Sequence, residues 1–92
     1  MIMDYHVPFG KRSTDKLIAE LPAIKDYAKI VLLRLHRVAD IPEGARVLDV
    51  GASVGRFVVA CNELGYSCEG VEPVDLSREK SKEIAEKLKQ PI

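Results

Sequence analysis

The sequence predicts an α/β fold in which a strand–helix–strand–helix unit follows N-terminal helices. Three observations carry this prediction. Apolar residues of the first half recur at helical spacing, a continuous apolar run follows at residues 46–50, and a second strand pattern comes at residues 66–72. Because one helix of about nine residues separates the two strand patterns, we expect parallel strands that are neighbours in one sheet.

The N-terminal part is expected to be helical after an irregular start. Residues 1–13 combine a proline, a glycine and a basic pair, which argues against regular structure there. Side chains at residues 13–15 can cap a short helix that ends at Leu21. A longer helix is expected over residues 22–39, because its apolar side chains form a single stripe. They are Ile24, Ala28, Val31, Leu32, Leu35, Val38 and Ala39.

The first strand and its helix follow a turn at residues 40–44, which contains a proline and a glycine. Residues 46–50 are rich in β-branched and apolar side chains, as in a strand that is buried in a sheet. Helical spacing returns over residues 56–64, and Gly65 then stands where a helix commonly ends. We expect the apolar face of this helix to pack on the sheet.

The second strand and the last helix complete the unit. Residues 66–72 form a strand pattern, which Pro73 ends. Asp75 or Ser77 can cap a last helix over residues 78–89. The outer face of that helix is a run of lysine and glutamate at spacing i, i+4, which is typical of a solvated helix face.

Composition and charge bound the function. The chain has 92 residues, of which 47% are hydrophobic and 30% charged, as in one globular domain. Its 14 basic and 14 acidic residues cancel, so charge favours neither nucleic acid nor an anionic membrane as a general partner. No apolar run approaches the roughly 20 residues that span a bilayer, and the N-terminus does not resemble a signal peptide. We therefore expect a cytoplasmic protein whose Cys61 and Cys68 are free thiols.

The stretch VLDVGASVGRF at residues 47–57 combines a strand end, a glycine-bracketed loop and a helix start. In open α/β sheets, ligands bind at this edge of the sheet. Gly51 and Gly55 let the backbone approach a ligand closely, and the helix N-terminus adds free N–H groups. Glu72 follows 21 residues after Gly51, where an acid can accept hydrogen bonds from a ribose diol. Together these features predict a bound nucleoside.

The acid before the loop narrows the choice of nucleoside. A dinucleotide fingerprint, G-x-G-x-x-G, would place glycines where this chain has Ser53 and Arg56. Asp49, two residues before Gly51, would repel a pyrophosphate but suits a ligand that carries an amino group. S-adenosylmethionine fits these requirements, because it has a sulfonium, an α-amino group and no phosphate.

These residues resemble the first two motifs of class I S-adenosylmethionine-dependent methyltransferases. The family's first motif is an acid, one further residue and then G-x-G-x-G. This chain matches it at Asp49, Gly51 and Gly55, with Ser53 in the place of the middle glycine. The second motif is an acid that ends the second strand, here Glu72.

The resemblance implies a fold and a cofactor site. Residues 41–92 would be the first βαβα portion of a Rossmann-like domain, which is incomplete here, and residues 1–40 an N-terminal helical segment. The helix over residues 22–39 resembles the helix that often covers the cofactor site in this family. Asp49 would hold the methionine amino group, the loop backbone would lie against the methionine and the ribose, and Glu72 would bind the ribose hydroxyls. The implied cofactor-binding residues are Asp49, Val50, Gly51, Ala52, Ser53, Gly55, Glu72 and Pro73. The resemblance identifies no metal ligand, no catalytic residue and no methyl acceptor.

The chain supplies only two strands of the family's larger sheet, which leaves two possibilities open. It is either the N-terminal part of a longer methyltransferase, which we favour, or a complete chain. A complete chain would shield its sheet edges by dimerising or by pairing residues 2–7 as an extra strand. We expect these 92 residues alone to be inactive. Tyr5 and Phe9 are either a flap over the pocket or part of a disordered tail.

Each feature also has a simpler interpretation. Asp49 can cap the next helix, the two glycines can form only a tight turn, and Glu72 can be a solvated loop acid. Arg56 either steers a carboxylate or is a solvated arginine at a helix start, which we favour. His6 and His36 are expected to be surface or structural residues. Two other classes of function stay open: a non-catalytic nucleoside-binding or interaction module, and a nicotinamide-dependent enzyme, which the acid and the missing glycines disfavour.

Overall fold

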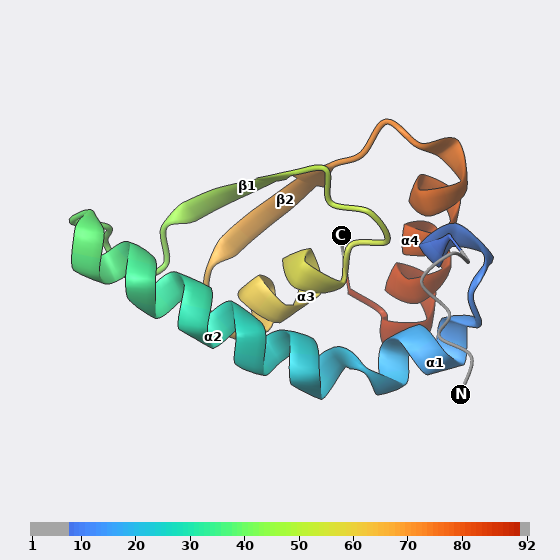
Figure 1. Ribbon diagram of the computed structural model, residues 1–92, viewed down its shortest axis with the longest axis horizontal. Helices are drawn as coiled ribbons and strands as arrows, with labels where there is room; N and C mark the ends of the chain where they lie inside the picture. The colour runs from blue at the N-terminus through green and yellow to red at the C-terminus, as the bar shows by residue number, and fades with distance from the viewer. Residues whose placement is uncertain (1–7, 91–92) are drawn as a thin grey trace.

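The computed structural model describes residues 8–90, which contain two strands, four α-helices and one 3₁₀ helix (Figure 1). In chain order the elements are η2 (Phe9–Lys11, the 3₁₀ helix), α1 (Thr14–Ala19), α2 (Leu21–Val38), β1 (Arg46–Val50), α3 (Arg56–Glu63), β2 (Ser67–Val71) and α4 (Asp75–Leu88). The predicted α/β class is therefore confirmed. The expectations for Tyr5, His6 and residues 2–7 fall outside the described residues. None of the described helices is long and apolar enough to cross a membrane.

Strands β1 and β2 pair in parallel, with Arg46 opposite Ser67 and Val50 opposite Val71. The prediction of parallel neighbours is thus confirmed. Helices α2 and α3 both lie on one side of this sheet (Figure 1). The opposite face carries Leu48, Val50 and Val71, which are 61%, 79% and 52% exposed. Within the described part of the chain, this face of the sheet is therefore bare.

The N-terminal stretch is more regular than the sequence predicts. Residues Phe9–Lys11 form η2, which packs on α4. The close contact needs a glycine, because a Cβ at Gly10 would lie 2.9 Å from the carbonyl carbon of Leu76. The predicted cap of α1 is confirmed, since the Oγ of Ser13 accepts a hydrogen bond from the Lys16 N–H at 3.5 Å.

The last helix begins earlier than predicted. It starts at Asp75, and neither Asp75 nor Ser77 caps it with a side chain. Instead, the Val74 N–H, just before the helix, donates to Oε2 of Glu72 at 2.9 Å. The acid that follows β2 therefore replaces the expected cap. The helix ends at Leu88, one residue before the predicted end.

Helix α3 ends at the predicted glycine. Gly65 has a φ of +96°, and its N–H donates to the carbonyl of Asn62, while the Tyr66 N–H donates to that of Cys61. The Asn62 side chain then accepts a hydrogen bond from the Cys68 N–H at 2.7 Å and donates one to the Cys68 carbonyl at 3.2 Å. These bonds hold the start of β2 against α3.

Two groups of buried side chains form the core. The first group joins α2, α3, β2 and the glycine loop through Ala28, Leu32, Ala52, Val58, Ala60, Cys61 and Cys68. The second joins α1, the loop and α4 through Leu17, Val54 and Ile84. Ala52 and Val54 are two residues apart but enter different groups, so the loop lies between the two. Both cysteines are buried free thiols, as expected.

Candidate functional site

The glycine loop has a left-handed backbone at every second residue. The φ angle is +77° at Gly51, +54° at Ser53 and +84° at Gly55. These are the three positions of the G-x-G-x-G pattern, so the pattern coincides with the left-handed residues of the turn. Ser53 adopts this conformation with a side chain, at a cost of about 1 kcal/mol. Neighbouring groups must therefore hold it there.

Hydrogen bonds from the end of β2 hold the loop in place. The N–H groups of Gly51 and Ala52 both donate to the carbonyl of Val71, at 2.8 and 3.0 Å. The Ser53 N–H donates to Oε1 of Glu72 at 2.8 Å. The side chains on either side of Ser53 are buried in the two core groups. The loop is therefore pre-organised, and its two glycines supply left-handed residues of the turn.

Glu72 joins the two loops that follow the strands. One carboxylate oxygen accepts the Ser53 N–H and the other accepts the Val74 N–H. Each carboxylate oxygen can accept two hydrogen bonds, so each keeps one acceptor position for a ligand hydroxyl. The interpretation of Glu72 as a solvated loop acid is wrong. Sequence reasoning missed its structural role, because the bonded loop residue lies 19 positions away.

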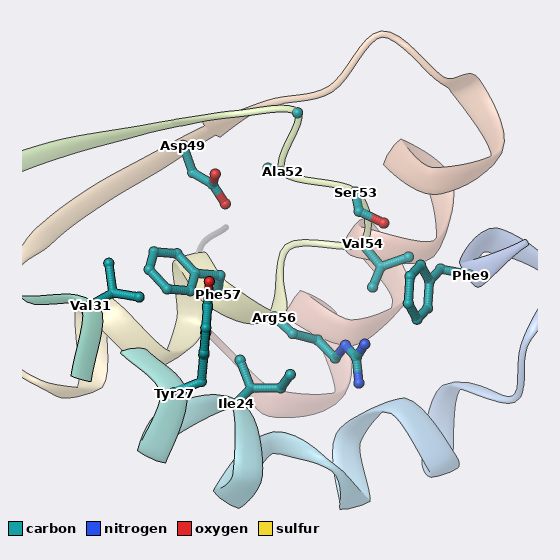
Figure 2. Close-up of a pocket in the computed structure, with 11 residues that line it drawn as sticks. Phe9, Ile24, Tyr27, Val31, Asp49, Ala52, Ser53, Val54, Arg56 and Phe57 are labelled. Carbon is teal, nitrogen blue, oxygen red and sulfur yellow. The ribbon is translucent and has the colours of Figure 1, made fainter. Parts of the chain in front are cut away.

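Asp49 lies in a pocket of about 340 Å³ between β1, the glycine loop, α2 and the start of α3 (Figure 2). Within residues 8–90, its carboxylate takes part in no hydrogen bond and no ion pair. The interpretation of Asp49 as the cap of α3 is wrong, since Gly55 is the N-cap and no side chain caps this helix. The pocket is lined by Phe9, Ile24, Tyr27, Val31, Asp49, Gly51, Ala52, Ser53, Val54, Arg56 and Phe57.

The environment of Asp49 favours a cationic ligand. Burial raises the pKa of the Asp49 carboxyl above its ordinary value of 3.8, because an apolar wall solvates the carboxylate less well than water does. A cation bound in the pocket would stabilise the carboxylate and lower that pKa again. An unpaired acid among apolar side chains is therefore suited to an ammonium or a sulfonium group.

The Asp49→Asn variant is expected to have a higher melting temperature than the wild type at pH 7. The raised pKa of Asp49 means that the native state holds this proton more tightly than the unfolded chain does. Wild-type stability therefore falls as pH rises from the unfolded pKa through the raised native pKa, whereas asparagine has no such loss. The difference in stability between the variant and the wild type should reach its full size above the native pKa of Asp49. It should vanish below about pH 3, where the carboxyl is protonated in both the native and the unfolded state.

Thermal denaturation of both proteins from pH 3 to pH 8 measures this difference. The exposed acid Asp40 provides the control, since Asp40→Asn removes the same charge from the surface. An Asp49→Asn variant that is less stable than the wild type at pH 7 would show that the carboxylate makes a stabilising contact instead.

The expectation that Arg56 is a solvated arginine at a helix start is wrong. Its side chain is only 11% exposed, so it is not a solvated arginine. It forms an ion pair with Glu20 at 3.1 Å, and its guanidinium lies 5.0 Å from the centre of the Phe9 ring. Glu20 is 36 residues away in the chain, which is why no local pattern indicated this pair. Phe9 belongs to η2 and lines the pocket, which agrees with the flap interpretation.

The two predicted acids lie in different cavities. A second cavity, of about 190 Å³, is lined by Glu72 together with Arg78 and Lys82. Ala52 and Ser53 line both cavities, so the loop separates them. A ligand that contacts both acids must therefore pass over the loop.

Two of the predicted cofactor-binding residues, Val50 and Pro73, lie outside both cavities. Val50 lies on the bare face of the sheet, and Pro73 is exposed and lines neither of these two cavities. His36 is structural, as expected, because its Nε2 lies 2.5 Å from the Tyr66 hydroxyl. In residues 8–90, no three metal-ligating side chains gather closely enough to hold an ion.

Comparison of the chain with protein-family models, with curated proteins and with solved structures finds no match.

Proposed function

We propose that the chain is the cofactor-binding part of an S-adenosylmethionine-dependent methyltransferase, with residues 41–92 as a Rossmann-like βαβα half. The observation that carries the proposal is the unpaired Asp49 carboxylate beside a pre-organised glycine loop. This arrangement offers a negative charge and a closely approachable backbone at the same end of β1. Few ligands need both, and a nucleoside with a cationic amino acid tail is one of them.

The two cavities suit the two halves of this cofactor. The methionine part carries the positive charge and would lie in the first cavity, with its amino group at Asp49. The ribose would lie at Glu72, whose two oxygens each keep an acceptor position. A nicotinamide dinucleotide suits the site less well, because its pyrophosphate would lie near the Asp49 carboxylate and beside the Ser53 side chain.

The cofactor would supply a methyl group on a sulfonium. A lone pair of the acceptor would bond to that carbon in line as the carbon–sulfur bond breaks, with S-adenosylhomocysteine as the leaving group. The residues of this chain would contribute the positions of the reacting groups. The loop and the two acids would hold the reacting carbon at one place, which favours an aligned attack. Phe9, Tyr27 and Phe57 line the pocket with aromatic rings, against which the methionine part would pack.

The bare face of the sheet is a surface that further helices could cover. Leu48, Val50 and Val71 expose apolar area that a complete α/β domain would cover with helices. We propose that the remainder of a methyltransferase domain covers this face, and a second copy of the chain is the alternative.

The proposal is tested by calorimetric titration of the chain with S-adenosylhomocysteine, with NAD as the control ligand. Asp49→Ala is expected to weaken binding by about 1–3 kcal/mol, or roughly 5- to 150-fold, because the ligand loses a charged hydrogen bond. Glu72→Ala should cause a similar loss, although it also removes the acceptor for two backbone N–H groups. Thermal denaturation of the Glu72 variant separates the two effects.

Asp40→Ala is the matched control, because it removes an exposed acid from the loop after α2. Wild-type affinity in both the Asp49 and Glu72 variants would contradict these roles. Binding of NAD as tight as that of S-adenosylhomocysteine would contradict the choice of cofactor.

A further inference from the structure

The pocket that contains Asp49 has a charged group at each end. Asp49 lies at the carboxyl end of β1, whereas the Arg56 side chain extends away from it toward Phe9 (Figure 2). Between the two ends the walls are apolar and include Ile24 and Tyr27. A ligand that fills this pocket therefore meets an anion at one end, a hydrocarbon surface in the middle and a cation at the other end.

The Arg56 end favours an anion for three reasons. The guanidinium is largely buried, so its charge is poorly screened by water. Arg56 is also the first residue of α3, whose N-terminus has no side-chain cap and carries a partial positive charge. Finally, the Phe9 ring lies 5.0 Å from the Arg56 guanidinium, which places an aromatic surface beside the positive charge.

Glu20 is the present partner of Arg56, and it is a replaceable one. Its side chain is 56% exposed, while that of Arg56 is 11% exposed. An ion pair with an exposed carboxylate contributes little, because water solvates that carboxylate almost as well. A ligand carboxylate that arrives with an apolar body would gain the same charge contact and bury hydrocarbon against the pocket wall as well.

We propose that the Arg56 end of the pocket binds the carboxylate of a small acid with an apolar or aromatic body, and that Glu20 occupies this position in the free protein. The assignment rests on the proposed function: Asp49 and the loop hold the cofactor, and the acid is the methyl acceptor. The pocket of about 340 Å³ would also hold the methionine part of the cofactor, so the space at its Arg56 end suits a small compound and not a folded macromolecule.

The inference is tested by NMR titration of ¹⁵N-labelled protein at low salt with phenylacetate and with phenylacetamide, which differs only in its charge. The acid is expected to shift the amide signals of Arg56 and its neighbours, and the neutral amide is not. Glu20→Gln removes the internal competitor and should tighten binding of the acid by about 2- to 5-fold. Arg56→Gln should weaken it by about 10-fold or more.

Glu63→Gln is the matched control, because Glu63 pairs with Lys25 of α2 at 3.6 Å, whereas Glu20 pairs with Arg56. This variant should bind phenylacetate as the wild type does. Equal affinity in the wild type and Glu20→Gln, binding of the amide as tight as that of the acid, or no binding of the acid would each overturn the inference. Because Glu20→Gln leaves Arg56 in place, the test does not depend on the folding of the Arg56 variant.

Titration with S-adenosylhomocysteine in the same samples tests the proposed function separately. If phenylacetate binds as described and S-adenosylhomocysteine does not, the carboxylate site stands and its assignment to the methyl acceptor fails. If S-adenosylhomocysteine binds and phenylacetate does not, the cofactor assignment stands and the carboxylate site fails.

Discussion

Gly70→Ala is expected to destabilise the protein by about 1–3 kcal/mol, which corresponds to a fall in melting temperature of roughly 5–20 °C. A Cβ at Gly70 would lie 2.6 Å from the Cβ of Ala52 and 3.0 Å from Cγ2 of Val58. The Ala52 Cβ cannot move by itself, because the Ala52 N–H is bonded to the carbonyl of Val71. The extra methyl group must therefore displace the whole glycine loop or the adjacent part of β2.

The same variant should also weaken binding of S-adenosylhomocysteine, because the displaced loop forms part of both cavities. Thermal denaturation and calorimetric titration measure the two effects. Glu69→Ala is the control, since Glu69 precedes Gly70 in the strand but is exposed. In a strand without a clash, replacement of glycine by alanine is neutral or stabilising. A Gly70→Ala protein as stable as the wild type would thus contradict the contact between β2 and the loop.

Leu17→Ala is expected to have the largest effect on stability, with a loss of about 2–5 kcal/mol. Leu17 is fully buried and, with Val54 and Ile84, forms the core group that joins α1, the loop and α4. A domain of this size has a total stability of roughly 5–15 kcal/mol, so this loss is a large fraction of it. Removal of the side chain leaves a cavity beside Val54. It therefore weakens the packing of Val54, which together with Ala52 holds the glycine loop in the core.

Chemical denaturation with urea measures the loss. The control is Ile30→Ala on α2, where the replaced residue is 51% exposed and the expected change is within about 0.5 kcal/mol. If both variants lose the same small amount of stability, the packing of α1 against α4 through Leu17 is not formed in solution.

The order and type of the secondary-structure elements could be predicted from the sequence, because each element has a pattern of apolar, capping or turn residues within its own length. The run Arg46–Val50 matches the predicted strand at both ends, because its apolar and β-branched residues favour a strand and the flanking turn interrupts them. The expectation that this strand is buried is wrong, since Leu48 and Val50 are largely exposed. Gly65 ends α3 where predicted, because a left-handed residue is needed there and glycine adopts that conformation at the lowest cost. The start of α4 was less predictable, since Glu72, only two residues before Val74, accepts the Val74 N–H and neither Asp75 nor Ser77 caps the helix.

The sequence alone determined the α/β class, the parallel strand pair, and the place of Asp49, the glycine loop and Glu72 at the carboxyl ends of the strands. These follow from periodicity and from steric rules that act over a few residues. Only the tertiary structure decided which groups those side chains meet. It left Asp49 unpaired, joined Glu72 to two loops, and brought Arg56 to Glu20 and Phe9. These contacts join residues up to 47 positions apart, and their energies depend on burial and distance, which appear only when the chain has folded.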